Sequence, residues 1–116
     1  MLRPERDQRF AQTPSPPYYV AVFTSLRNEG DCGYGVVAQR MLELACQQPG
    51  YLGVESARDA DGFGITVSYW SSEEAIAAWK AQAEHAIAQQ TGRNDWYSSY
   101  ELRVAKVERA VSYRAS

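Results

Sequence analysis

The chain has 116 residues, of which 45% are hydrophobic, so it can form one domain with a small core that would gain from burial against a partner. Twelve basic and fourteen acidic side chains give a net charge of −2 and are mixed along the sequence. This balance excludes the cationic footprint of a protein that binds nucleic acid or an anionic membrane, and it favours a small neutral or apolar ligand.

Neither a secretion signal nor a membrane span is visible. No charged-then-apolar leader opens the sequence, and no run approaches the roughly 20 apolar residues that a spanning helix needs. Cys32 and Cys46 fall near opposite ends of one predicted helix, about 20 Å apart, so a disulfide between them is not expected. We therefore expect a reduced, cytoplasmic protein.

Residues 1–17 show no lasting periodicity and contain a proline cluster at positions 14–17, which disfavours both a helix and a central strand. We expect a flexible N-terminal tail, followed by a single domain over residues 18–116. The alternative is an arm that packs on a neighbouring subunit through Leu2 and Phe10.

The first predicted strand, residues 18–26, is largely apolar on both faces. Both faces therefore need cover, from helices on one side and from a second sheet or subunit on the other. A loop over residues 27–35 follows, with Asp31 as the expected N-cap of a helix. The apolar stripe of that helix runs to about Gln48, and the Pro-Gly pair at positions 49–50 ends it.

Residues 51–70 predict a β-hairpin with its turn over residues 59–62. One face of the second strand is apolar and consists of Phe63, Ile65, Val67 and Tyr69. The other face is smaller and more polar, so that a ligand could approach it, and consists of Gly64, Thr66, Ser68 and Trp70. Glu55 and Arg58 are expected to face solvent or to pair with each other, with contact to a ligand as the alternative.

A second helix begins where Ser71 or Ser72, followed by Glu74, resembles a capping box with Ser71 at the N-cap, and the helix ends near Gly92. A strand from about Trp96 to Arg109 closes the domain. The order β-α-β-β-α-β predicts a ferredoxin-like α+β fold, with a four-stranded antiparallel sheet and both helices on one face. Since the uncovered face is apolar in the first strand, we expect a homodimer in which two sheets face each other.

Several kinds of catalytic site are not supported by the sequence. One histidine and two distant cysteines offer no pair of metal ligands. No GxSxG or cysteine signature accompanies His85, and the glycines near positions 33–35 and 62–64 lack the strand-loop-helix context that binds dinucleotides. We therefore predict no metal and no cofactor.

An aromatic cluster near the second helix is the remaining candidate site. Its members would line an apolar pocket between that helix and the sheet, and they are Trp70, Trp79, Trp96, Tyr97 and Tyr100. His85 is the candidate catalytic base, because an imidazole exchanges protons near neutral pH. It lies six residues after Trp79, roughly 120° around the helix axis, so it reaches the pocket from the flank or faces solvent. The alternative is that the tryptophans belong to the core and His85 to the surface.

The segments QPGYLGVESARD and GFGITVSYWSSEEAIAAWKAQAEHAIAQQ resemble the antibiotic biosynthesis monooxygenase family. The resemblance covers roughly residues 18–110. It implies a dimeric α+β barrel and, for some members, cofactor-independent oxidation of polyphenolic substrates.

A haem-degrading branch of this superfamily has an asparagine in the first strand, and a tryptophan and a histidine ten residues apart in the second helix. Here Thr24 and Ser25 stand in the strand, and Gln89 follows Trp79 by ten residues. Only Trp79 is carried over, so the resemblance argues against haem degradation.

Three functional hypotheses follow. The first is a small cofactor-independent monooxygenase that acts on an electron-rich aromatic or quinol-type molecule. The second is a non-catalytic dimer that binds a small apolar or aromatic ligand. The third is a haem-binding protein without degradation activity. A fold supports many functions, so the site must decide among them.

Overall fold

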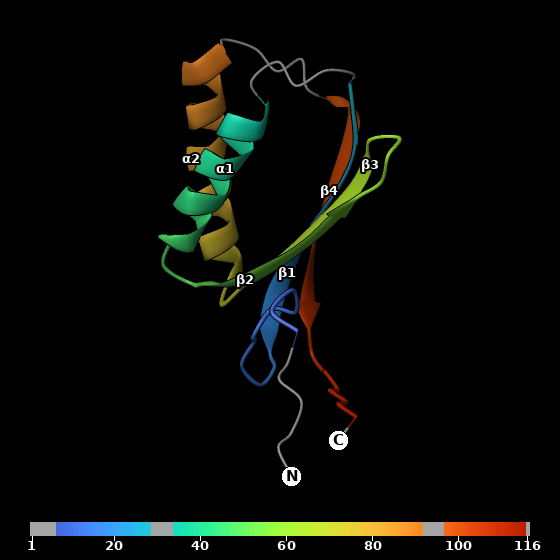
Figure 1. Cartoon of the computed structure of the whole chain (residues 1–116). Coiled ribbons are helices and arrows are strands. Elements are labelled where there is room, and N and C mark those ends of the chain that lie inside the picture. The colour runs from blue at the N-terminus through green and yellow to red at the C-terminus, as the bar shows by residue number, and fades with distance from the viewer. Residues whose placement is uncertain (1–6, 29–33, 92–96, 116) are drawn as a thin grey trace.

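A computed structural model describes residues 7–28, 34–91 and 97–115, and among these it describes the side chains of residues 7–28, 39–83 and 99–115 (Figure 1). The secondary-structure elements are β1 Tyr18–Arg27, α1 Tyr34–Cys46, β2 Tyr51–Arg58, β3 Phe63–Trp70, α2 Glu73–Thr91 and β4 Tyr97–Val107. This order and the single antiparallel sheet confirm the predicted ferredoxin-like α+β fold.

The four strands are arranged β2-β3-β1-β4, with both helices on one face of the sheet (Figure 1). Ala21 on β1 lies opposite Ser68 on β3 and Val104 on β4, so these three side chains share a face. Alternation along the strands then assigns every second residue to the helix-covered face and its neighbours to the uncovered face.

The core lies at one end of the sheet, where the helices meet it. Trp70, the last residue of β3, is fully buried and packs with Ala21, Ala45 and Ile76, which come from β1, α1 and α2. The helices lie side by side and diverge from the sheet toward its other end (Figure 1). Trp70 thus lies at the centre of the contact between the helix pair and the sheet.

Two local predictions need adjustment. The first helix, α1, ends at Cys46, two residues before the expected Gln48. The hydroxyl oxygen of Ser72, not that of Ser71, accepts a hydrogen bond from the backbone N–H of Ala75 at 3.1 Å, so Ser72 caps α2. Ser71 instead donates its backbone N–H to the Gly50 carbonyl at 2.8 Å, which ties the turn after α1 to the end of β3. The predicted caps Asp31 and Gly92 lie outside the described residues.

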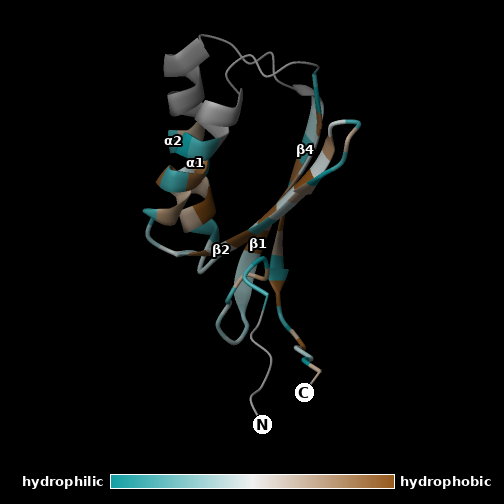
Figure 2. Ribbon diagram, viewed as in Figure 1, coloured by the Kyte–Doolittle hydropathy of each residue, from teal (hydrophilic) through white to brown (hydrophobic). Residues whose placement is uncertain are grey.

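The uncovered face of the sheet carries apolar side chains on its two central strands. Val22 lies opposite Val67, and Leu26 lies opposite Phe63. Phe63 is 48% exposed and Ile65 is 42% exposed, so the part of this face near the β2–β3 turn lacks cover in the isolated chain. Hydrophobic residues recur along the sheet (Figure 2). The pattern agrees with the two apolar faces expected of β1, and the dimer itself stays a prediction.

The described part of the N-terminal segment lies against β2. The backbone N–H of Ala11 donates to Oε2 of Glu55 at 3.0 Å, and the Thr13 hydroxyl donates to the Tyr18 hydroxyl oxygen at 3.2 Å. Phe10 is more than half exposed, and Leu2 lies outside the described residues. The flexibility expected of residues 1–17 therefore stays a prediction.

In the described part of the chain, no helix combines the length and apolar character needed to cross a bilayer.

Candidate functional site

The helix-covered face of the sheet has a polar centre. Thr66 lies four residues before the buried Trp70 on β3, so its side chain points to the same side as that core residue. Its hydroxyl lies 2.7 Å from the hydroxyl of Ser56 on β2, and Ser68 follows it on the same face. The polar surface predicted for β3 therefore faces the helices, and we call Ser56, Thr66 and Ser68 the hydroxyl cluster.

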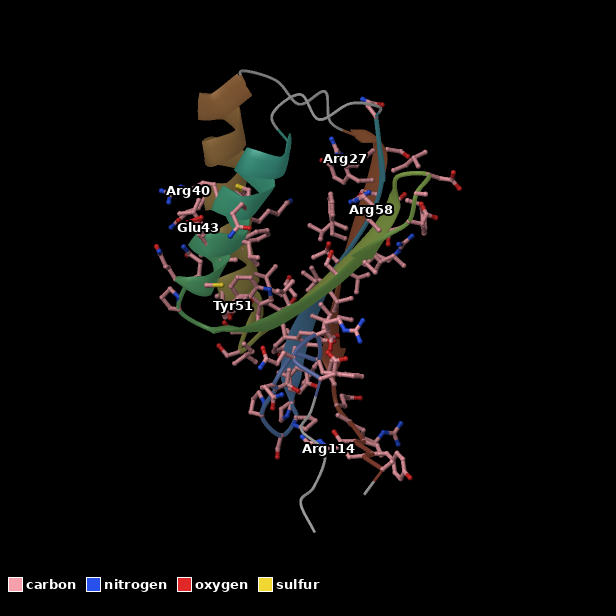
Figure 3. The ribbon with its side chains drawn as sticks, viewed as in Figure 1. Arg27, Arg40, Glu43, Tyr51, Arg58 and Arg114 are labelled. Carbon is pink, nitrogen blue, oxygen red and sulfur yellow. The ribbon has the colours of Figure 1, made fainter. Side chains whose placement is uncertain are left out.

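Arg58 crosses β3 at the end of the sheet farther from Trp70. Its Nη2 donates to the hydroxyl oxygen of Ser25 on β1 at 2.8 Å, and its Nη1 donates to the Gly62 carbonyl. A Cβ at Gly64 would lie 2.6 Å from Cζ of Arg58, so the absence of a side chain at this position gives the guanidinium its path across β3. Arg58 and Arg27 both extend from the sheet on its helix side (Figure 3).

Glu55 and Arg58 do not pair with each other, so that part of the expectation is wrong. Glu55 lies opposite Val67 and Arg58 lies opposite Gly64, which places them on opposite faces of the sheet. The Glu55 carboxylate accepts hydrogen bonds from the Tyr69 hydroxyl and the Ala11 backbone N–H. It therefore holds the N-terminal segment on the uncovered face.

Trp70 and Trp79 form a contacting pair between β3 and α2. Their ring centroids are 5.8 Å apart and the rings are tilted by 41°. Both Nε1 atoms are buried, and neither has an acceptor among the residues that the structure describes. An unpaired buried donor costs about 1–3 kcal/mol, so an oxygen atom that accepts from either indole would bind favourably.

Tyr51 continues this aromatic contact toward the surface. Its ring meets Trp70 edge to face, with centroids 5.6 Å apart, and it lies where the turn after α1 enters β2 (Figure 3). Burial, with the Cys46 thiol beside the hydroxyl, raises the pKa of Tyr51 to about 12. Cys46 itself is a free, exposed thiol. On the other face, burial and the Glu55 carboxylate raise the pKa of Tyr69 well above its usual value.

The raised pKa of Tyr51 predicts a loss of stability in alkali. Above the ordinary tyrosine pKa of 10.0 the unfolded chain loses this proton, while the folded chain keeps it up to about 12. The unfolded chain then binds fewer protons, so the stabilisation is complete below that window and falls as the pH rises through it. Tyr51→Phe should therefore flatten the decline in the free energy of unfolding across the window. Urea denaturation at a series of pH values measures it, and equal slopes for the two proteins would contradict it.

The structure brings together some of the predicted site residues and separates others. Trp70 and Trp79 are in contact, but Tyr100 packs on Phe23 with ring centroids 5.3 Å apart, opposite Ser25 on β1. Trp70 lies opposite Tyr19, and Tyr19 lies opposite Lys106 on β4. Tyr100 precedes Lys106 by six residues, and it is 58% exposed. The predicted site residues thus separate into two groups on the helix-covered side, with Trp70 and Trp79 at one end of the sheet and Tyr100 at the other.

The remaining predicted residues cannot be compared in this way. Trp96 lies outside the described residues, and so do the side chains of His85 and Tyr97. Their roles stay predictions. Within residues 7–28, 34–91 and 97–115, no three His, Cys, Asp or Glu side chains gather in a way that could hold a metal ion.

Sequence reasoning missed the Arg58–Ser25 contact and the Tyr51–Cys46 contact. For the first contact, the predicted turn over residues 59–62 would have paired Arg58 with Phe63, whereas the structure pairs Arg58 with Gly64, a residue without a side chain to block it. The second joins the end of a helix to the start of a strand. No spacing rule predicts that contact, because it depends on how the turn folds back.

Comparison with known proteins identifies relatives over most of the chain. Residues 17–91 match the family described as Antibiotic biosynthesis monooxygenase. The chain is 57% identical over 99 residues to the uncharacterized protein YqjZ of Bacillus subtilis (strain 168), which covers 85% of this chain and 87% of that protein. It is 34% identical over 50 residues to the jasmonate monooxygenase ABM of Pyricularia oryzae, which covers 43% of this chain and 23% of that protein.

Solved structures with the same fold include one that is named for its activity and one that is named with a bound ligand. SnoaB, a cofactor-independent oxygenase from Streptomyces nogalater, superposes with a TM-score of 0.64 at 13% identity, over 84% of this chain and 100% of that one. A point mutant of MhuD, with two manganese protoporphyrin IX bound per active site, superposes with a TM-score of 0.61 at 22% identity, over 82% of this chain and 99% of that one. At these identities the likeness shows the fold alone.

Proposed function

This chain belongs to the antibiotic biosynthesis monooxygenase family, and from that premise we propose that it is a small cofactor-independent oxygenase of electron-rich aromatic or quinol-type molecules. The family includes cofactor-independent monooxygenases. The substrate would bind between α2 and the sheet, and it would itself supply the electrons that reduce O2. With an anthrone-type substrate, a ring CH2 becomes a carbonyl, one oxygen atom enters the product and the other leaves as water.

The pair of buried indole N–H groups is the observation that carries this proposal. Trp70 and Trp79 present donors that lack an acceptor in the described part of the chain, and a phenolic or quinone oxygen is such an acceptor. Because both nitrogens are buried, neighbouring side chains must shift to admit the ligand. The recovered hydrogen-bond energy, about 1–3 kcal/mol per donor, favours that shift.

The hydroxyl cluster offers further polar contacts at the centre of the same face. Ser56 and Thr66 hydroxyls 2.7 Å apart can exchange their mutual hydrogen bond for bonds to substrate hydroxyls. His85 on α2 is the proposed base. Removal of a phenolic proton would raise the electron density of the ring before it meets O2, a contribution typically of about 10²–10⁴ in rate.

We also propose that the functional unit is a homodimer that uses the uncovered sheet face. Apolar side chains on β1 and β3 remain exposed there, and a second copy presents the same surface in return. A cytoplasmic location is part of the proposal, and the free thiol of Cys46 is compatible with a reducing compartment.

Trp79→Phe tests the donor role, since it keeps an aromatic ring and removes the N–H. We expect kcat/KM for oxygen uptake with an anthrone or quinol substrate to fall about tenfold, the equivalent of one lost hydrogen bond.

His85→Ala should lower the rate by about 10²-fold or more, with Gln82→Ala as the control on the same helix. Oxygen uptake is followed with an electrode.

A non-catalytic binding module is the competing function, because the same donors could hold a ligand without turnover. It predicts that a quinol raises the melting temperature while oxygen uptake stays nil. Identical products in aerobic and anaerobic incubations would likewise rule out the oxygenase. A Soret band on haem titration would support the third hypothesis, haem binding without degradation.

A further inference from the structure

Four side chains that can each lose one electron form a continuous series from α2 to the surface. They are Trp79, Trp70, Tyr51 and Cys46. The Trp79 and Trp70 ring centroids are 5.8 Å apart, those of Trp70 and Tyr51 are 5.6 Å apart, and the Cys46 thiol lies beside the Tyr51 hydroxyl. Electrons pass rapidly between aromatic rings in contact, because the transfer rate falls steeply with the distance between them. The series therefore has no gap that would slow an electron.

The four side chains differ in burial, and Cys46 at the end of the series is exposed to solvent. Trp70 is fully buried, so the central step takes place away from water and from dissolved reductants. Cys46 is exposed at the C-terminal end of α1. Trp79 and Tyr51 are each partly buried, so an electron vacancy, one missing electron, that starts at Trp79 and passes the core arrives at a thiol that a soluble reductant can reach.

The proton positions favour movement in this direction. The buried Nε1–H groups of Trp70 and Trp79 have no acceptor among the described residues, so an oxidised indole keeps its proton and remains a strong oxidant. Tyr51 differs, because the Cys46 thiol lies beside its hydroxyl and can return a hydrogen atom to a tyrosyl radical whose own proton has passed to water. The vacancy is therefore most stable at the Tyr51 and Cys46 end.

We propose that Trp79, Trp70, Tyr51 and Cys46 form an electron relay that transfers an oxidising equivalent from a radical beside Trp79 to the exposed thiol. The radical gains one electron and becomes an anion, the Cys46 thiol loses one hydrogen atom and becomes a thiyl radical, and one proton passes to water. Each aromatic side chain loses one electron and regains one. A soluble thiol then returns a hydrogen atom to Cys46.

The physiological role of the relay rests on the proposed function, but the relay itself does not. An oxygenase whose substrate gives electrons to O2 one at a time can also form oxygen-derived radicals such as a peroxyl, and a peroxyl radical that escapes productive reaction would oxidise the nearest tryptophan. The relay moves that damage to a thiol whose early oxidation products are reversible. Substrate is not needed to test the electron transfer.

Pulse radiolysis with azide radicals, which oxidise tryptophan preferentially, tests the relay. A Trp96→Phe background removes the tryptophan outside the described residues from the signal. We expect the tryptophan radical to decay into a tyrosyl radical with a first-order rate independent of protein concentration. Tyr51→Phe should slow this decay at least about tenfold, and Trp79→Phe should abolish the delayed tyrosyl phase.

Tyr69→Phe is the matched control, because it removes another hydroxyl of raised pKa, but on the opposite face of the sheet. It should leave the decay unchanged, whereas Cys46→Ser should prolong the tyrosyl radical. A decay in Tyr51→Phe at the unsubstituted rate, or the absence of a delayed tyrosyl phase, would overturn the relay. Failure of the oxygenase would be seen separately, as nil oxygen uptake with a normal radical decay.

Discussion

Trp70→Ala should lower the free energy of unfolding by about 3–5 kcal/mol, the usual cost of truncating a large buried aromatic side chain. Trp70 is fully buried and packs against Ala21, Ala45 and Ile76, so its removal leaves a cavity where the helices meet the sheet. Domains of this kind are typically stable by only about 5–15 kcal/mol, so the variant would lose a large part of its stability. Urea denaturation at fixed protein concentration measures the change.

Two variants separate packing from other effects of the Trp70 substitution. Trp70→Phe fills most of the space and loses only the indole N–H, so it should destabilise much less than alanine. Tyr113→Ala truncates an aromatic ring that is 87% exposed, and it should change stability by less than about 0.5 kcal/mol. A loss no greater for Trp70→Ala than for Tyr113→Ala would show that Trp70 does not hold the two layers together.

Ile65→Lys should convert the proposed homodimer into a monomer. Ile65 lies on β3 opposite Thr24 and Ala57, within the uncovered face, and it is 42% exposed in the isolated chain. A lysine there would bring two like charges into an apolar interface, and the desolvation of each charge costs more than such an interface can return. Size-exclusion chromatography with light scattering at micromolar concentration should show the mass halved.

Leu42→Lys is a matched control for the dimer experiment. Leu42 is 39% exposed, close to the value for Ile65, but it lies on α1. The same change at this position should leave the dimer intact. A monomeric unsubstituted protein, or equal dissociation of both variants, would contradict the proposed interface.

The relay and the proposed site share Trp70 and Trp79, but they use different properties of these residues. Substrate binding uses the unpaired N–H groups, whereas electron transfer uses the contact between the rings. Trp79→Phe affects both functions. Tyr51→Phe keeps the ring that packs on Trp70 and should leave oxygen uptake unchanged while it slows the relay, so the two functions can be separated by experiment.

Local sequence signals predicted the elements because each signal acts within a few residues. An apolar run identified β1 and alternating side chains identified β3, and the Pro49-Gly50 pair lies just beyond α1, which ends at Cys46 and not at about Gln48. The cap of α2 shifted by one residue, from Ser71 to Ser72, because either serine could supply the oxygen and the turn geometry selected one. The polar face of β3 was also correctly predicted to differ from its apolar face.

The candidate site was harder to predict, since proximity in space depends on register. Trp70, Trp79 and Tyr100 looked like one aromatic cluster in the sequence, but the antiparallel pairing of β1 with β4 places Tyr100 beside Ser25, at the other end of the sheet. Likewise Glu55 and Arg58 are three residues apart, and the alternation of a strand places them on opposite faces.

The sequence by itself determined the order of elements and the two chemically different faces of the sheet, since short-range periodicity encodes these features directly. Only the tertiary structure decided that Trp79, Trp70, Tyr51 and Cys46 lie in contact and that Arg58 reaches Ser25 across Gly64. Those contacts join residues from separate elements, and they form only when the helices pack at one end of a sheet whose register is already set.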